Sequence, residues 1–433
     1  MVRSSSNGFH MMRFAVAMSA MMTTSVMAQQ PSPQTPPQTP IGCLTSAQQY
    51  ERQQMRAARA SSAPANARNI HAQALALASK CAAQFDPATI NPEERPALGF
   101  LYLSIGKTPA AMELLQRVER ELPANDSARA TTLLRVMQAY GANPDGVAAI
   151  ADCERVAARI DTIPGTHAQK LAARGALIGW ANNADLDDVA RRGVAAVLAL
   201  VPKLTPDEQR ENASIVLDAY STRAVHYANA LHADSAIAIL RAAPAALPGI
   251  PDAAAKLARE ITRYEMIGHP APPIRADYWV NRQALPLKNS ATILVFTANW
   301  CHSCIPSYPA LTSIAKLYGA NDVQLIFSID LDGQFRGVSM TPAQEVEANR
   351  KYYTVEHGFT NAIALQRNTS GDMPPPGAKA NASAYVVSYL PQVVVIDRQG
   401  IVRAFLQGWD ATGNRERSLR LAVQHVLRGG SPR

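Results

Sequence analysis

Two cysteines separated by two residues form the part of this sequence best suited to covalent chemistry. Cys301 and Cys304 enclose His302 and Ser303 and follow Trp300 directly, in the run ILVFTANWCHSC. Thiols at this spacing can close a reversible disulfide within one helical turn, so that one sulfur attacks a substrate and the other resolves the mixed disulfide. The motif therefore predicts a redox-active pair, with Cys301 as the nucleophile and Cys304 as the resolving cysteine.

The elements on either side of the motif are predicted to position it. The apolar run ILVF before it is typical of a buried strand, and the residues after it have helical spacing. That helical pattern consists of Leu311, Ile314, Ala315 and Tyr318. Cys301 then lies where a strand ends and a helix begins, and the N–H groups of a helix N-terminus favour a thiolate over a thiol.

His302 is the member of the dipeptide with a chemical role to weigh. A histidine beside the attacking thiolate stabilises it, most strongly when the imidazole is protonated. Such stabilisation would make the disulfide couple more oxidising. The alternative is an exposed histidine that changes the couple little, and the sequence leaves both open.

A zinc site is the principal alternative use of a CxxC pair. It would need two further ligands at similar spacing, whereas the other cysteines and histidines of the relevant regions stand singly. These are Cys43, Cys81, Cys153, His269, His357 and His425. We therefore predict no metal site. The sequence also lacks the acidic or Thr/Arg-assisted single cysteine that a peroxidase would need.

Length and composition limit the remaining possibilities. A chain of 433 residues with 47% hydrophobic residues predicts two or three packed domains and excludes wholesale disorder. Five cysteines are too few for a disulfide-dense small scaffold. The net charge of +8 comes from scattered basic residues, so we predict no nucleic-acid partner.

The N-terminus has the features of an export signal. Arg3 and Arg13 precede a short apolar segment, residues 14–28, which ends in the small-residue pattern before Ala28. We predict a signal peptide over 1–28 and a mature protein in the periplasm or otherwise exported, an oxidising compartment. If the segment is not cleaved, it would tether the protein to the membrane. No later apolar run is long enough to span a bilayer.

Composition divides the rest of the chain into three parts. Residues 29–42 are proline-rich and predict an extended linker. Residues 43–268 are rich in Ala, Leu and Arg with helical periodicity, and a second proline cluster follows at 268–274. In 269–433, strand-like runs alternate with helical patterns, which indicates an α/β domain.

The helical part contains traces of a repeat. One copy fits the tetratricopeptide pattern of a helical hairpin, and a poorer copy lacks its Leu-Gly pair. The first comprises Leu98, Gly99, Tyr102, Ala111, Leu115 and Pro123, and the second Tyr227, Ala236, Leu240, Ala243 and Pro248. Stacked hairpins present a concave face that could hold a peptide or partner protein. An irregular helical bundle is the alternative.

Residues 270–430 resemble the thioredoxin-fold domain of exported TlpA-like thiol–disulfide oxidoreductases. The resemblance rests on Trp300 before the CxxC pair, on Pro309 in the following helix, and on Leu390-Pro391 before the strand QVVVID. It implies a thioredoxin fold with a central mixed β-sheet, so that with the repeat pattern the predicted fold class is an all-helical hairpin-repeat region followed by a thioredoxin fold. It also implies protein thiols or disulfides as substrates, and no cofactor, because the cysteines carry the redox couple.

The resemblance assigns supporting roles and also shows departures. It implies a cis peptide bond at Leu390-Pro391, with Leu390 opposite the disulfide, and Trp300 as a packing and substrate-platform residue. Ser307 replaces an acid that some relatives carry after the second cysteine. The proton acceptor for Cys304 would then be Asp330, Glu345 or a water.

Two questions stay open at this stage. Cys43 and Cys81 are the nearest candidates for a second disulfide, but these cysteines and Cys153 could equally be small buried hydrophobic residues. The whole chain could be an exported oxidoreductase whose helical region recruits a partner. Alternatively, it could be a partner-binding helical scaffold with a structural or weakly active thioredoxin-fold appendage.

Overall fold

A computed structural model describes residues 39–60, 67–143, 146–184, 186–284, 286–319, 322–336, 338–367, 381–409 and 413–429. The chain divides into two compact units, an N-terminal unit of residues 1–169 and a C-terminal unit of residues 170–433. The predicted signal peptide, 1–28, lies outside the described residues. None of the helices described has the length and apolar character needed to cross a membrane.

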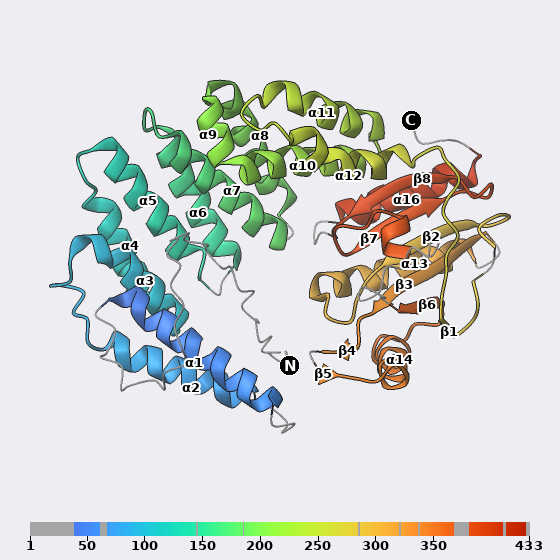
Figure 1. The fold of residues 1–433 in the computed structure, drawn as a ribbon, viewed down its shortest axis with the longest axis horizontal. Helices are drawn as coiled ribbons and strands as arrows, with labels where there is room; N and C mark the ends of the chain where they lie inside the picture. The colour runs from blue at the N-terminus through green and yellow to red at the C-terminus, as the bar shows by residue number, and fades with distance from the viewer. Residues whose placement is uncertain are drawn as a thin grey trace. The chain divides into compact units, whose positions relative to one another are not determined.

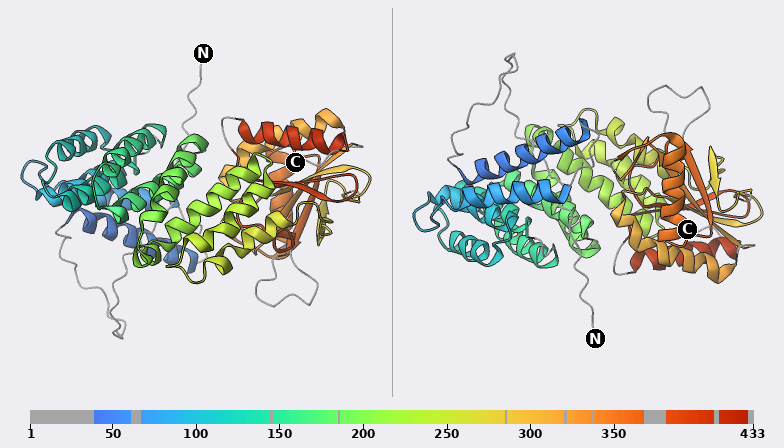
Figure 2. Two further views of the ribbon diagram at one scale, coloured as in Figure 1. Left: turned by 90° about the horizontal axis from the view of Figure 1, so that it is seen from above. Right: turned by 90° about the horizontal axis from the view of Figure 1, so that it is seen from below.

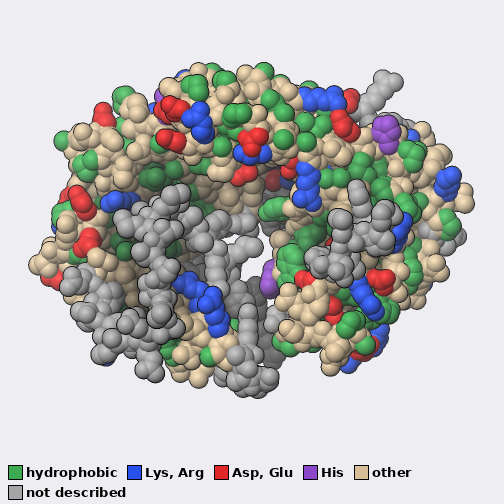
Figure 3. Space-filling view, in the orientation of Figure 1, with side chains coloured by type: hydrophobic (Ala, Val, Ile, Leu, Met, Phe, Trp, Pro, Cys, Tyr) green, Lys and Arg blue, Asp and Glu red, His purple; other side chains and the backbone are tan. Residues whose placement is uncertain are grey.

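The N-terminal unit is helical, and consecutive helices pack against each other (Figure 1). Its helices are α1 (Pro40–Ala60), α2 (Ala67–Ala82), α3 (Arg95–Ser104), α4 (Thr108–Arg120), α5 (Asp126–Tyr140) and α6 (Gly146–Asp161). Helix α1 thus begins inside the segment predicted as a linker over 29–42. On the face in Figure 3, basic and acidic side chains are interspersed.

The first predicted repeat copy is a helical hairpin made by α3 and α4. A Cβ atom added to Gly99 would lie 2.6 Å from a methyl carbon of Leu115, so a larger residue there would force the Leu115 side chain to move. Ala111 and Leu115 are fully buried in the same contact. The second copy is also a hairpin, formed by α10 and α11 of the C-terminal unit. The hairpins are present, while their assignment to the tetratricopeptide class stays a prediction.

The N-terminal unit contains a disulfide between Cys43 of α1 and Cys81 of α2. Of the three cysteines outside the motif, it joins the two that are nearest in sequence, and it leaves Cys153 as a buried free thiol. Burial raises the pKa of Cys153, and its Sγ donates to the carbonyl oxygen of Met137 at 3.3 Å. An inert, buried thiol is what this environment produces.

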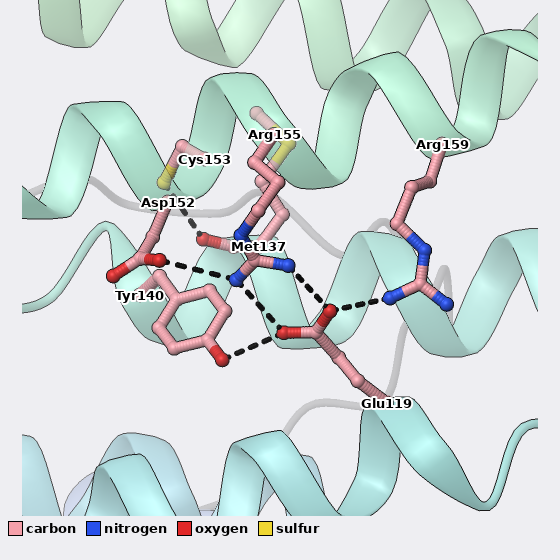
Figure 4. A network of polar contacts seen from close by, with 7 residues as sticks. All are labelled: Glu119, Met137, Tyr140, Asp152, Cys153, Arg155 and Arg159. Carbon is pink, nitrogen blue, oxygen red and sulfur yellow. Dashed lines mark hydrogen bonds and ion pairs between the residues drawn. The ribbon is translucent and has the colours of Figure 1, made fainter.

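A buried carboxylate connects three helices of this unit (Figure 4). Glu119 of α4 accepts hydrogen bonds from Tyr140 of α5 at 2.7 Å and from Arg155 of α6 at 2.7 and 3.1 Å, and it also pairs with Arg159. Burial raises the pKa of Glu119, but the hydrogen bonds and the two arginine charges outweigh burial and lower the pKa below 4.5. The ionised form is therefore the one that holds these helices together.

The C-terminal unit combines helices with a six-stranded mixed sheet in the order β1-β6-β3-β2-β7-β8. Its helices are α7 (His167–Asn183, which crosses the unit boundary), α8 (Asp187–Leu200), α9 (Pro206–Glu211), α10 (Ala213–Asn229), α11 (Ala233–Ala246), α12 (Ala253–Glu265), α13 (Tyr308–Tyr318), α14 (Pro342–Lys351), α15 (Asn381–Ala384) and α16 (Asn414–Leu427). Its strands are β1 (Tyr278–Val280), β2 (Ala291–Phe296), β3 (Val323–Leu331), β6 (Ala362–Arg367), β7 (Gln392–Ile396) and β8 (Val402–Gln407). A separate hairpin pairs β4 (Gln334–Phe335) with β5 (Val338–Ser339).

Parallel and antiparallel pairings give the sheet the topology of a thioredoxin fold. Strands β2, β3 and β6 are parallel to one another, β7 is antiparallel to β2, and β8 is antiparallel to β7. The crossover helix α13 joins β2 to β3, and the terminal helix α16 follows β8. The predicted fold class, an all-helical hairpin region followed by a thioredoxin fold with a central mixed sheet, is confirmed.

Helices cover both faces of the sheet, but the helices on the two faces come from different parts of the chain. One face packs against α13 and α16, which lie side by side (Figure 2). The other face carries Leu294, Phe296 and Phe405, and it shares one apolar core with α10, α11 and α12. The helix α15 on that side is a single turn of four residues. The helices before residue 268 therefore supply cover that this face of the sheet requires.

The predicted boundary at 268/269 marks the change from helix to strand but lies inside the C-terminal unit. The proline segment there is bound to the sheet, because the Gly268 and Ala271 amides donate to the Val402 and Gly400 carbonyls at 2.8 Å. Asn229, at the end of α10, makes two hydrogen bonds with the backbone of Gln407, at 2.8 and 3.1 Å. The side-chain amide of Asn229 thus takes the place of a neighbouring strand for Gln407, at the edge of the sheet.

We predict that Asn229→Ala destabilises the C-terminal unit by about 2 kcal/mol, because the buried Gln407 N–H loses its Asn229 acceptor while the Gln407 carbonyl keeps a hydrogen bond from Arg415. All four tryptophans, at 180, 279, 300 and 409, belong to this unit. Urea unfolding of the full chain followed by tryptophan fluorescence therefore measures it selectively. Asn182→Ala, at an exposed position of α7, is the matched control. Equal midpoints for both variants would contradict the assignment.

A second prediction concerns Glu119. A carboxylate whose pKa is lowered on folding adds stability that is present above its unfolded pKa and is lost as the pH falls through the folded value. Glu119→Gln should therefore lower the unfolding midpoint of the N-terminal unit at pH 7. The difference from the unchanged protein should shrink below about pH 4. Far-UV circular dichroism in urea, at a series of pH values, checks this. A constant difference over the whole series would argue against the ionised network.

Candidate functional site

The two cysteines of the motif are joined in a disulfide with an S–S distance of 2.03 Å. Cys301 is 5% exposed and Cys304 is fully buried, so the first sulfur is the more accessible one. Cys301 follows the end of β2 by a short loop and occupies the N-cap of a 3₁₀ helix, His302–Ser307. The sequence predicted an α-helix from this point. The regular helix α13 begins at Tyr308 instead, after a 3₁₀ turn that contains Pro306.

The two ends of the cysteine loop are fastened to each other. Thr297, just after β2, and Tyr308, the first residue of α13, are joined by a hydrogen bond of 2.7 Å between their hydroxyl groups. The Tyr308 ring packs edge-on against Phe359 and His357, with centroids 4.9 and 5.2 Å away. Burial raises the pKa of Tyr308 to about 12, so the phenol stays neutral. The loop therefore starts and ends on a packed aromatic base.

The residues around the disulfide differ in their exposure. Trp300 is 56% exposed, and His302 and Ser303 are exposed as well. The Ser303 hydroxyl lies 3.5 Å from the Cys301 sulfur. Ser307 is buried and donates a hydrogen bond to the Cys304 carbonyl at 2.6 Å. The Ser303 hydroxyl thus lies beside the more accessible sulfur, and the indole and imidazole of the neighbouring residues are open to solvent.

A second segment reaches the same core from the other end of the fold. The Leu390-Pro391 peptide bond is cis, the isomer that the resemblance implies. Leu390 packs against the apolar cluster that contains both cysteines, and the Pro391 carbonyl accepts a hydrogen bond from the Gly408 amide at 2.9 Å. The preceding Tyr389 is 51% exposed. Of the residues predicted from the sequence, Cys301, Cys304 and Leu390 therefore share one apolar core, and Trp300 and Pro391 are their neighbours in the chain.

Helix α12 holds the approach to this proline. The guanidinium of Arg263 is buried and donates to the Val386 carbonyl at 2.8 Å and to the Ser388 hydroxyl. Arg259 donates to the Val387 carbonyl at 2.7 Å. Burial lowers the pKa of Arg263, and the Val386 carbonyl and the Ser388 hydroxyl accept hydrogen bonds from its buried guanidinium. A helix from the predicted helical region thus fixes the backbone just before the cis bond.

Asp330 and Glu345, the two carboxylates considered as proton acceptors for Cys304, have other surroundings than that role requires. Asp330 alternates with Ile329 and Leu331, which face the cysteine cluster, so its side chain points to the opposite face of the sheet. Burial raises its pKa to about 6, with a smaller contribution from the charge of Asp332. The Glu345 carboxylate accepts hydrogen bonds from the amides of Asp332 and Gly333 at 2.9 and 3.0 Å.

Sequence reasoning missed a group of residues beside the motif. Asn299, which precedes Trp300, is buried and donates to Asn349 of α14 at 3.2 Å. An open groove of about 410 Å³ lies there, lined by Asn299, Trp300, Asp332, Gln334 and Arg336. Gln334 is in β4, and the hairpin of β4 and β5 lies next to α14 (Figure 1). The only signal in the sequence is the turn-like DGQFRG after β3.

Comparison with known proteins gives similarity of structure over part of the chain. No family model matches the sequence, and no curated protein matches it.

Three solved structures with similarity cover about a third of this chain. A thioredoxin-like superfamily protein has 18% identity and a TM-score of 0.29 over 36% of this chain and 96% of its own. A thiol-disulfide isomerase from Corynebacterium glutamicum has 22% identity and a TM-score of 0.29, and the match covers 36% of this chain and 96% of the isomerase. A putative thiol:disulfide interchange protein DsbE from Chlorobium tepidum has 20% identity and a TM-score of 0.24, and the match covers 32% of this chain and 82% of the DsbE chain.

Proposed function

We propose that this protein is an exported thiol–disulfide oxidoreductase that acts on protein disulfides or dithiols. The observation that supports this most is the asymmetry of the Cys301–Cys304 disulfide. It stands at the start of the helical segment after a buried strand, with one sulfur 5% exposed and the other fully buried. An accessible nucleophile and a buried resolving thiol are what sequential thiol exchange needs.

The proposed exchange balances as follows in the direction that reduces a client. The Cys301 thiolate attacks one sulfur of the client disulfide, forms a mixed disulfide and releases the other client sulfur as a thiolate, which takes up a proton. Cys304 loses its proton to solvent and attacks the Cys301 sulfur, which releases the second client thiolate. Two electrons pass to the client and the Cys301–Cys304 disulfide forms. Oxidation of a client dithiol uses the same mixed disulfide in reverse.

Export and partner recruitment are parts of the same proposal. The Cys43–Cys81 disulfide supports an oxidising compartment, because structural disulfides persist there and are rare in the cytosol. The residues predicted as a signal peptide fit the same location. The helical hairpins of the N-terminal unit would recruit a client or a redox partner, as stacked hairpins commonly do.

The test is the reduction potential of the Cys301/Cys304 pair in the full chain. We expect a reversible disulfide when the protein is equilibrated in glutathione buffers and its thiols are trapped. A potential near or below about −250 mV identifies a reductase that needs an electron donor, and one near or above about −150 mV identifies a donor of disulfides. Cys301→Ser is the control without the pair, and the buried Cys153 gives a constant background in both proteins.

The absence of any reversible disulfide in that experiment would rule out the enzyme. The helical scaffold would then be the remaining function, and partner binding should survive in Cys301→Ser.

We also predict that His302→Ala lowers the reduction potential of the pair. A protonated imidazole beside the Cys301 thiolate stabilises the reduced form, so its removal favours the disulfide. His269→Ala, at another exposed histidine, is the matched control and should leave the potential unchanged. Equal potentials for both variants would show that His302 does not tune the couple.

A further inference from the structure

Asn299, which lines the groove beside Trp300, carries a buried hydrogen-bond acceptor that has no partner in the described structure. Asn349 donates through its amide to the Glu345 carbonyl at 3.0 Å, and a carbonyl can only accept. The oxygen of Asn349 therefore faces Asn299, which must present its own amide nitrogen. This leaves Oδ1 of Asn299 unpartnered although the residue is only 8% exposed. A buried acceptor without a partner costs free energy that a ligand donor could recover.

The other groups that line the groove favour a cationic donor. Asp332 is exposed, and its backbone amide, held by Glu345, fixes the position from which its carboxylate projects. Trp300 offers an exposed indole face, which attracts a guanidinium or ammonium group. A basic side chain could satisfy the Asn299 oxygen, pair with Asp332 and stack on Trp300 together.

Arg336 is the one basic residue among those that line the groove, and its charge is already paired. Arg336 pairs with Glu356 at 2.8 Å, and its guanidinium lies over the rings of Tyr352 and Phe335, 4.9 and 5.3 Å from their centroids. With this charge paired, Asp332 gives the groove its negative character. An acidic client side chain would meet that carboxylate and the Asn299 oxygen, both of which repel it.

We propose that this groove is a specificity subsite that binds an Arg or Lys side chain next to the reacting cysteine of a client polypeptide. The proposal rests on the proposed function, because the groove adjoins the nucleophile through Trp300. The basic side chain positions the client sulfur at Cys301 while the exchange itself follows the steps given above. Asn299 and Asp332 are binding residues that take no part in the transfer of electrons.

The experiment uses the reduced full chain and short peptides with one cysteine, activated as the mixed disulfide with thionitrobenzoate. The Cys301 thiolate attacks the peptide sulfur and releases thionitrobenzoate, whose absorbance gives the rate. Arg, norleucine or Glu stands directly before or directly after the cysteine. Each rate is divided by the rate of the same peptide with dithiothreitol, which removes the effect of the neighbouring charge on intrinsic reactivity.

We expect the normalised rate for the better Arg peptide to exceed that for norleucine by about fivefold, and Glu to fall below norleucine. The preference should shrink at high ionic strength. In Asp332→Asn the ratio of Arg to norleucine should fall towards one, and in Asn299→Leu it should also fall. Asp234→Asn, which removes an exposed carboxylate of α11 outside the groove, should keep the ratio.

Equal normalised rates for Arg and norleucine in both positions would overturn the subsite, as would a preference that survives in Asp332→Asn. Bis(2-hydroxyethyl) disulfide, which has no side chain for the groove, separates the two proposals. If the reduced protein exchanges with neither this compound nor any peptide, the oxidoreductase function itself is wrong. If the protein exchanges with this compound but shows no preference among the peptides, the subsite proposal is wrong and the oxidoreductase function is not contradicted.

Discussion

Burial of both faces of β2 is the constraint on which the C-terminal unit depends. Every residue of this strand, Ala291–Phe296, is buried, so each face of the sheet must be covered by apolar side chains. Helices α13 and α16 cover one face, and the cysteine pair sits at its margin. Among the described residues after β6, the single turn of α15 is the one helix on the other face, and α10–α12 complete its cover. The helical region is thus part of the fold that carries the disulfide.

The site itself depends on polar groups that are each satisfied by a neighbour. Arg259 and Arg263 fix the backbone before Pro391, and Thr297 and Tyr308 fasten the cysteine loop to its base. The chain of hydrogen bonds from the turn after β3 through Glu345 and Asn349 ends at Asn299. It ends on an acceptor that is left open, and the proposed subsite follows from that acceptor.

Local patterns predicted much of the sheet and the motif. The apolar runs ILVF and QVVVID indicated β2 and β7, and the alternation of strand-like and helical patterns indicated an α/β domain. The two-residue β4 and β5 carry no periodic pattern, so the hairpin was missed. The role of the helices before residue 268 was also missed, because periodicity shows that a helix has an apolar face but not which element covers it. For the same reason, the opposite orientation of Asp330 emerged only once the neighbours of β3 were known.

The hydrogen bonds between Asn229 and Gln407 join residues that are 178 positions apart in the chain. During synthesis, α10–α12 leave the ribosome long before β8 exists. Until then their apolar residues, among them Leu240, Leu257 and Tyr264, have no sheet to pack against. The nascent chain therefore carries an exposed hydrophobic surface until the strands that follow have been made, and contacts of such long range form slowly. Holding chaperones have a defined segment to protect in this protein, and the disulfide site assembles only at the end.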